Sequence, residues 1–222
     1  MARIDPNNPS PRCAACRQPP RWCICAGLTT LACPLRIDVL MHRNERWRPS
    51  STGRLIKRVF PDSGQHFTPE NGRLEADAIR APGRELLVLH PAGEALSPGL
   101  DPATLQVLLL DGSWSEATHL RREVSGWGRL VSLPMTGESR YWLRTQQEAD
   151  GRFSTVEALM FLLAALGLEA EHKELNLQFE LLVYAGLRAR GRKELAEKFL
   201  ETSPIRGTHA DLIAQLNVSR PR

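Results

Sequence analysis

Four cysteines near the N-terminus have the spacing of a metal site. The motif Cys13-x2-Cys16-x6-Cys23-x-Cys25 places four thiols within thirteen residues, as two close pairs separated by Pro19 and Pro20. Four thiolates can close a tetrahedral site around Zn²⁺, with Zn–S bonds of about 2.3 Å. Such a site has no open coordination position, so we expect it to fold a segment that is too short to build a core. Redox-active thiols and inert cysteines are the alternatives.

A second candidate is the turn Asp111-Gly112-Ser113-Trp114, which directly follows the most strongly apolar run of the chain, residues 105–110. Enzymes with parallel sheets hold catalytic groups at the carboxyl ends of their strands. Gly112 permits a sharp turn, Ser113 can cap a following helix, and Trp114 offers either a stacking face or a core anchor. An Asp after a strand is also a common turn or cap residue, so the turn alone leaves both interpretations open.

Basic residues are concentrated in the front of the chain. Residues 1–60 contain eleven basic and three acidic side chains, a net charge of +8, whereas the remainder carries −4. A patch of one sign attracts polyanions and adds sequence-independent affinity for nucleic acid. Around the cysteines, basic and aromatic side chains alternate in a way that suits the phosphates and unstacked bases of RNA: Arg12, Arg17, Arg21 and Trp22. A merely soluble, Arg-rich surface is the alternative.

Three further side-chain groups are candidates. His42 and Glu45 follow the first predicted strand and could orient each other or a substrate, although such pairs also occur on plain loops. Arg54 and Arg58 lie one helical turn apart beside Lys57, which suits phosphate contact unless this is a solvated face. Cys33 is left over from the cluster, and we expect it to be a small buried apolar residue.

The elements that must position these residues alternate between strand and helix. Apolar runs predict strands at residues 36–41, 86–89, 105–110 and 129–133, and the first of them should turn Ile37, Val39 and Met41 to one face and polar Asp38 to the other. Helices are predicted at 50–60 with a Ser or Thr cap, at 70–79, at 115–123, after a capping box of Ser154 and Glu157, and at 173–190. The pattern indicates an α/β domain with a mostly parallel sheet flanked by helices.

Composition and length limit the class of protein. The 222 residues are 42% hydrophobic and 24% charged, which excludes disordered, collagen-like and coiled-coil chains. We expect a flexible arm at residues 1–11, a zinc-binding unit at 1–34, and a catalytic domain at 35–222 that ends in a helical tail. The polar segment 135–152 is long for a loop inside a compact domain, which points to function. No apolar run reaches the roughly 20 residues of a membrane span, and no signal peptide is visible, so we expect a cytoplasmic protein without a membrane partner.

Taken together, these stretches resemble the DTW-domain family of tRNA-uridine aminocarboxypropyltransferases. The resemblance runs from Cys13 to about Leu168 and rests on the four-cysteine motif, His42-x2-Glu45 with Ser51-Thr52-Gly53-Arg54-Leu55, Asp111-Gly112-Ser113-Trp114-x2-Ala117, and Tyr141-x2-Arg144 with Ser154-Thr155-x-Glu157-Ala158. One position departs from the family's Asp-x-Thr-Trp pattern. Ser113 replaces the threonine, which keeps the hydroxyl and removes a methyl group.

The resemblance implies a SPOUT-like domain with a trefoil knot, although general topology rules disfavour knots. It also implies transfer of the 3-amino-3-carboxypropyl group of S-adenosylmethionine to the imide nitrogen of a tRNA uridine. We assign catalysis to Asp111, Ser113 and Trp114, with Asp111 as proton acceptor. Cofactor binding is assigned to Leu133, Pro134, Tyr141, Arg144, Ser154, Thr155 and Glu157, and RNA binding to Arg17, Arg21, His42, Arg54, Lys57 and Arg58.

The role given to Asp111 carries a condition. An exposed Asp has a pKa near 3.9 and is a feeble base, so Asp111 must act only as the proton leaves, or burial must raise its pKa. Three alternatives stay open: a SPOUT-type RNA methyltransferase, a non-enzymatic RNA-binding protein, and a hydrolase that uses Ser113 or Ser115. Against the last, the sequence around these serines lacks the Gly-x-Ser-x-Gly motif of such enzymes. The expected partners are tRNA and S-adenosylmethionine, and the expected state is a monomer.

Overall fold

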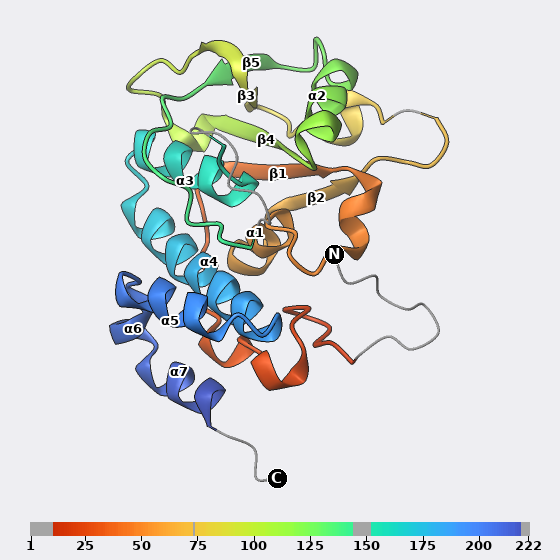
Figure 1. The fold of residues 1–222 in the computed structure, drawn as a ribbon. Helices are drawn as coiled ribbons and strands as arrows, with labels where there is room; N and C mark the ends of the chain where they lie inside the picture. The colour runs from red at the N-terminus through yellow and green to blue at the C-terminus, as the bar shows by residue number, and fades with distance from the viewer. Residues whose placement is uncertain (1–10, 73, 144–151, 219–222) are drawn as a thin grey trace.

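The computed structural model describes residues 11–72, 74–143 and 152–218. The N-terminal arm, except for its last residue, and the candidate Arg144 lie outside the described residues. A five-stranded parallel sheet with the order β2-β1-β4-β3-β5 forms the centre (Figure 1). Its strands are β1 (Arg36–Met41), β2 (Gly64–Phe67), β3 (Glu85–Ala95), β4 (Leu105–Asp111) and β5 (Arg129–Ser132). The predicted α/β class with a parallel sheet is confirmed, as are the four predicted strands.

The helices agree with the predicted ones in most places. They are α1 (Gly53–Val59), α2 (Trp114–Glu123), α3 (Thr155–Ala165), α4 (Glu169–Ala189), α5 (Lys193–Glu201), α6 (Ile205–Thr208) and α7 (Ala210–Asn217), with 3₁₀ turns η1 (Pro20–Trp22), η2 (Cys25–Gly27), η3 (Arg43–Trp47), η4 (Ala76–Ala78) and η5 (Pro102–Thr104). The predicted helix over 70–79 is wrong. Gly72 there has a φ of 82°, and the segment forms only η4 before Ile79 packs under the sheet.

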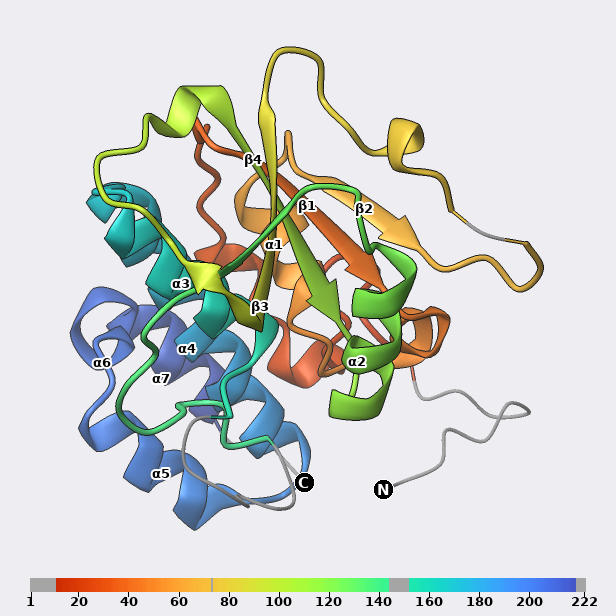
Figure 2. The same ribbon diagram turned by 90° about the horizontal axis from the view of Figure 1, so that it is seen from above.

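The two faces of the sheet have separate cores. Ile37, Val39 and Met41 face α1, α3 and α4, whereas Leu40 and Leu108 pack against α2. Figure 2 shows α2 on one side of the strands and α3 and α4 on the other. Because both faces of the central strands are covered, these strands read as continuous apolar runs. The carboxyl ends of β1 and β4 lie side by side, since Met41 pairs with Asp111.

Asp38, expected on the face opposite Ile37, Val39 and Met41, is fully buried. Burial alone would raise the pKa of this carboxyl. Hydrogen bonds from His66, Arg36 and Gln106 instead hold the pKa of Asp38 at about 2. The contact between His66 and Asp38 ties the edge strand β2 to β1, and β2 itself was missed because its four half-buried residues form no apolar run.

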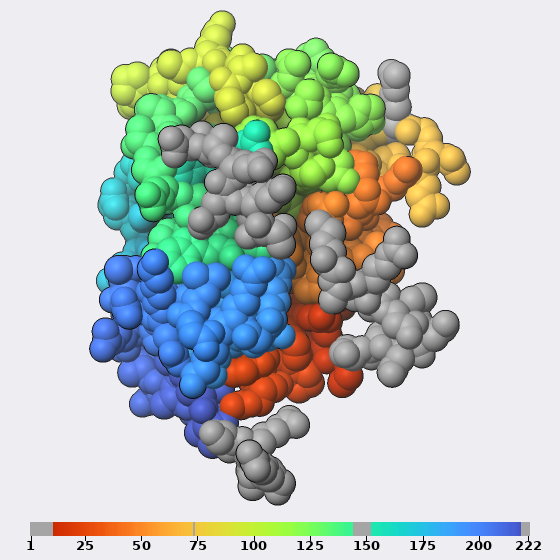
Figure 3. All heavy atoms as spheres, in the orientation of Figure 1, coloured from red at the N-terminus to blue at the C-terminus, as the bar shows by residue number. Residues whose placement is uncertain are grey.

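Residues 13–27, which contain the four cysteines and are called the cysteine segment below, pack against α4 together with the C-terminal helices. The Gln178 side chain in α4 donates to the Gly27 carbonyl at 2.7 Å, and the Arg188 guanidinium lies 4.9 Å from the Trp22 ring centre. In the space-filling view, the red N-terminal segment lies against the blue C-terminal helices (Figure 3). The predicted helical tail corresponds to α5–α7, while the division at residue 34 stays a prediction.

The described part of the polar segment after β5 is anchored by one arginine. Arg140 makes two hydrogen bonds to the buried Glu180 carboxylate in α4, at 2.9 and 2.7 Å, and its guanidinium lies 4.1 Å from the Phe199 ring centre in α5. Residues 135–143 therefore have a fixed path across the helices, although they form no regular element. No helix in the described part of the chain is long and apolar enough to cross a membrane.

Candidate active site and metal centre

The Asp111 carboxylate is the point at which distant segments of the chain meet. Asp111 ends β4 and is only 4% exposed. Its Oδ2 accepts a hydrogen bond from the Ser51 hydroxyl at 3.0 Å, and its Oδ1 accepts one from the Thr155 hydroxyl at 2.6 Å. Three stretches that looked unrelated in the sequence, before α1, after β4 and at the start of α3, thus share one carboxylate.

The start of α1 is shaped by the same group. The Ser or Thr cap expected there is absent: Thr52 makes no capping side-chain bond, and the Ser51 hydroxyl goes to Asp111. The Gly53 amide donates to the Asp111 carboxylate, which places a negative charge at a helix N-terminus. A Cβ on Gly53 would lie 2.6 Å from Asp111 Oδ2, so only glycine permits this approach.

The surroundings of Asp111 raise its pKa above the ordinary value. Burial raises its pKa, and the hydrogen bonds from Thr155 and Ser51, the charge of Arg48 and the Gly53 amide oppose that rise only in part. The condition placed on Asp111 from the sequence, a pKa raised by burial, is therefore met. Both carboxylate oxygens are nevertheless occupied by donors from the protein itself.

Glu45 is a second buried carboxyl at this edge of the sheet. It lies in η3, which follows β1, and pairs with Arg48. Burial, followed by the negative charge of Asp111, raises the pKa of Glu45 to about 7, because together they outweigh the Arg48 pairing. The His42 side chain does not pair with Glu45 but lies 3.1 Å from Glu116 Oε1.

Two tryptophans at this edge are exposed. Ser113 caps α2 in a capping box with Glu116, as expected, and Trp114 follows it with 46% of its surface exposed. Trp114 is therefore not a core anchor, and the Arg152 guanidinium lies 5.6 Å from its ring centre. Trp47 at the end of η3 is 68% exposed and was missed, since no sequence pattern distinguishes an exposed tryptophan from a buried one.

The residues predicted to bind the cofactor fall into two groups. Thr155 contacts Asp111, and the Tyr141 hydroxyl donates to the Ser50 carbonyl, so both lie beside the Asp111 cluster. The Glu157 carboxylate accepts hydrogen bonds from Ser139 and from the amides of Arg140 and Ser154, which commits its oxygens to holding the loop. Leu133 and Pro134 follow β5, two strands away from β4. Their roles stay predictions.

The residues predicted to bind RNA also separate. Arg17, Arg54 and Arg58 line one cleft between the cysteine segment and α1. Lys57 instead donates to the carbonyls of Pro61 and Ser63, at 2.6 and 2.7 Å, and Arg21 donates to the Val218 carbonyl. Their donors are engaged by the protein's own main chain.

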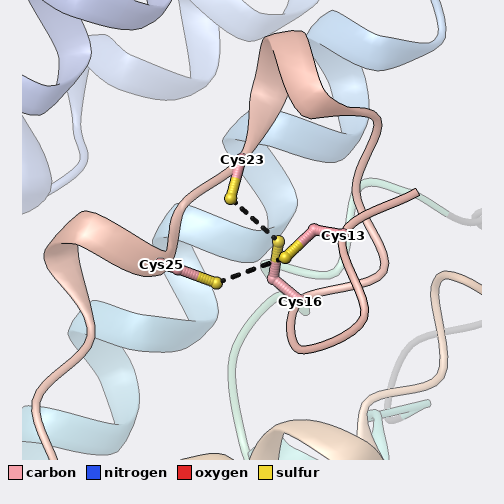
Figure 4. A group of neighbouring side chains, drawn as sticks. All are labelled: Cys13, Cys16, Cys23 and Cys25. Carbon is pink, nitrogen blue, oxygen red and sulfur yellow. Dashed lines mark hydrogen bonds between the residues drawn. The ribbon is translucent and has the colours of Figure 1, made fainter. Parts of the chain in front are cut away.

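The four predicted metal ligands converge. All four sulfurs lie within 4.8 Å of one another, with 3.6 Å between Cys13 and Cys25 and 3.7 Å between Cys16 and Cys23 (Figure 4). A zinc tetrahedron with bonds of about 2.3 Å has sulfur–sulfur edges of about 3.8 Å, so the group could hold a zinc ion. Cys33 is half-buried, and burial raises its pKa to about 11, in keeping with an inert thiol.

We expect metal analysis to separate Cys16 from Cys33. The purified protein should contain one zinc per chain; Cys16→Ser should lose it because three thiolates leave the tetrahedron open, and Cys33→Ser should retain it. The chelated protein should unfold at a lower temperature, since binding energy contributes to folding. A Cys16→Ser protein with full zinc content would contradict the assignment.

Gly53→Ala should disturb the Asp111 cluster. The added methyl group overlaps the carboxylate, and overpacking of this kind costs about 1–3 kcal/mol of the free energy of unfolding, measured by chemical denaturation. Gly207→Ala in α6 is the matched control, because no atom lies within 4 Å of its added Cβ. It should be neutral or stabilising by up to about 1 kcal/mol. Equal effects of the two substitutions would contradict the close approach at Gly53.

Glu45 should make stability fall as the pH rises. Its ordinary pKa is 4.5 and its folded pKa is about 7, so between these values the folded protein holds a proton that the unfolded chain has released. The stabilisation of the folded protein by Glu45 is complete below about pH 4.5 and is lost as the pH rises through 7. Glu45→Gln should flatten the curve of unfolding free energy against pH by up to about 3 kcal/mol. Glu194→Gln on the exposed face of α5 is the control, and parallel curves for wild type and Glu45→Gln would refute the assignment.

Comparison with known proteins agrees with this geometry. The model of the DTW domain, the domain of tRNA-uridine aminocarboxypropyltransferases, matches residues 10–185. Over 122 residues, 52% of the chain, the sequence is 31% identical to human Rho GTPase-activating protein 40, of which the chain covers only 15%. No solved structure shows a significant match. The matched range includes the cysteine cluster, the Asp111 turn and the starts of α1 and α3, and the chain therefore belongs to the DTW domain family.

Proposed function

We propose that this protein transfers the 3-amino-3-carboxypropyl group of S-adenosylmethionine to the imide nitrogen of a uridine in tRNA and releases 5′-methylthioadenosine. The observation that carries the proposal is the Asp111 cluster. Hydroxyls from two of the family-like stretches, Ser51 and Thr155, meet the carboxylate of the third at the carboxyl end of a central parallel strand. That is the edge at which such sheets bind ligands.

The chemistry depends mainly on positioning. The sulfonium of the donor has three electrophilic carbons, and the one held in line with the nucleophile reacts. In the proposed step a bond forms between the uracil nitrogen and the γ-carbon, the carbon–sulfur bond breaks with its electron pair going to sulfur, and the imide proton leaves. Reacting atoms about 3–3.5 Å apart meet this requirement. A rigid edge built on one buried carboxylate suits such a task.

We assign Asp111 a positioning role in place of proton transfer. Both of its oxygens already accept hydrogen bonds from hydroxyl groups of the protein, those of Ser51 and Thr155. Glu45 is the better proton acceptor, because a pKa of about 7 matches neutral pH, where general bases are most effective. Trp47 at the end of η3 and Trp114 at the start of α2 are exposed and would offer stacking faces to unpaired bases.

The remaining features are proposed from the family resemblance and from charge. We take the domain to be SPOUT-like with a trefoil knot, which the all-parallel sheet flanked by helices supports without establishing. The net charge of +8 in residues 1–60 supports tRNA as the partner. We further propose that the protein is cytoplasmic, that it is a monomer, and that its four cysteines hold a structural zinc.

One assay tests the reaction. The protein is incubated with unmodified tRNA and with S-adenosylmethionine labelled either in the methyl or in the carboxyl carbon. Carboxyl label on the tRNA is the expected result. Methyl label would replace the proposal with an RNA methyltransferase, and tRNA binding without transfer of either label would leave a binding protein.

Asp111→Asn should lower the transfer rate by about 100-fold while tRNA affinity stays unchanged, because a small displacement of the donor is enough to misalign the reacting atoms. Asp211→Asn, on the exposed face of α7, is the matched control and should keep full activity. Turnover of Asp111→Asn near that of the wild type would remove Asp111 from the mechanism.

A further inference from the structure

A narrow cleft between the cysteine segment and α1 is lined by three arginines. Arg17 comes from the loop after Cys16, and Arg54 and Arg58 come from α1; Ser51 also lines the cleft. Residues four apart on a helix lie on the same face, so Arg54 and Arg58 present neighbouring guanidinium groups. The cleft therefore brings cations from two separate segments of the chain next to the hydroxyl that holds Asp111.

The wall formed by the cysteine segment has a fixed shape. Arg17 has a φ of 60°, a left-handed conformation that non-glycine residues rarely adopt. Main-chain hydrogen bonds from the Arg17 amide to the Cys13 carbonyl and from the Cys13 amide to the Gln18 carbonyl close this turn, both at 2.9 Å. Arg58 reaches across from α1 to Cys25 Sγ, at 3.7 Å. The cluster and the cleft are thus joined by direct contacts.

Two donors in the cleft have no acceptor. The Nε atoms of Arg54 and Arg58 are buried and lack a hydrogen-bond partner among the described residues. One terminal nitrogen of each side chain is engaged: Arg54 Nη2 donates to the Arg46 carbonyl, and Arg58 Nη2 donates to Cys25 Sγ. Buried polar atoms without partners are rare in folded proteins and call for an explanation. An acceptor that belongs to a ligand would satisfy such donors.

The charge around the cleft specifies the sign of that ligand. Burial, and then the charges of Arg17 and Arg46, lower the pKa of Arg54, while Asp111 and Glu45 oppose this effect. Cations that repel one another across a buried space are stabilised by an anion between them. Guanidinium groups bind the oxygens of phosphates and carboxylates with paired, charge-assisted hydrogen bonds.

We propose that a substrate oxyanion binds in this cleft, held jointly by Arg54 and Arg58 on one side and by Arg17 on the other. The inference rests on the proposed function, whose two substrates supply the two sources of such a group: a phosphate of the RNA backbone or the carboxylate of the donor's amino acid tail. In either case the anion docks beside Ser51 and hence beside Asp111. The cysteine segment then forms one wall of a substrate site besides stabilising the fold.

The test compares Arg54→Gln, Arg58→Gln and the double variant, with Arg206→Gln on the exposed face of α6 as the control for lost charge. The dissociation constant for unmodified tRNA is measured across a range of salt concentrations. Each phosphate contact contributes about 0.7–0.9 to the slope of log affinity against log salt. If both side chains hold one phosphate, the slope for the double variant should fall by the contribution of one phosphate contact and not of two. The slope for Arg206→Gln should stay as in the wild type.

A carboxylate in the cleft gives a different pattern. The tRNA slope should then stay as in the wild type, while affinity for S-adenosylmethionine falls by about tenfold and affinity for decarboxylated S-adenosylmethionine does not change. Either pattern supports the site and identifies its source. Unchanged affinities for both substrates, or loss of two full phosphate steps in the double variant, would overturn a shared oxyanion.

Two further measurements keep the outcomes distinct. Thermal unfolding checks that the variants fold, and if a glutamine variant does not, Arg54→Met and Arg58→Met replace it, since methionine is flexible and unbranched but has neither the charge nor the Nε donor. If the wild-type protein transfers no label but the variants still lose a phosphate step, the proposed reaction is refuted while the cleft stays supported as an anion site. If the wild-type protein transfers label and the variants bind both substrates with wild-type affinity, the proposed reaction is supported and the cleft as an anion site is refuted.

Discussion

Burial of the Asp111 carboxylate is the constraint on which the functional edge of this protein depends. A carboxyl group removed from water is costly unless donors surround it, and here the donors come from Ser51, Gly53 and Thr155. Supplying hydrogen-bond donors to this one carboxylate therefore requires the starts of α1 and α3 to lie against the end of β4. The glycine at the start of α1 and the hydroxyls at the other two positions are consequences of that single requirement.

Buried carboxylates fix other parts of the fold in the same way. Asp38 binds the edge strand β2 through His66, and Glu180 in α4 binds Arg140 from the loop after β5. Glu157 at the start of α3 holds the main chain of the same loop. Each of these carboxylates joins segments that are distant in the sequence, so the edge strand and the loop after β5 acquire definite positions. Removing one partner from such a pair leaves a buried charge unpaired, which is why these contacts stabilise one arrangement and not a set of alternatives.

The cysteine segment depends on a different device. It contains only short 3₁₀ turns, and it is positioned by its four converging sulfurs and by its packing on α4. Through Arg17 and the Arg58 contact with Cys25, the segment also shapes the cleft beside α1. If these sulfurs hold a zinc ion as proposed, the same turn would stabilise the fold and hold Arg17 at the edge of the cleft.

The sequence by itself determined the features that depend on local patterns. Continuous apolar runs identified β1, β3, β4 and β5; Ser154 and Glu157 identified the start of α3; and cysteine spacing identified the four sulfurs that converge and could hold a metal ion. Tertiary structure alone decided the rest. It paired the short strand β2 with β1, turned Ser51 away from a helix cap and towards Asp111, left Trp47 exposed, and raised the pKa of Glu45. Each of these outcomes depends on which distant groups surround a residue, because burial and hydrogen-bond partners are properties of the folded neighbourhood and not of the spacing along the chain.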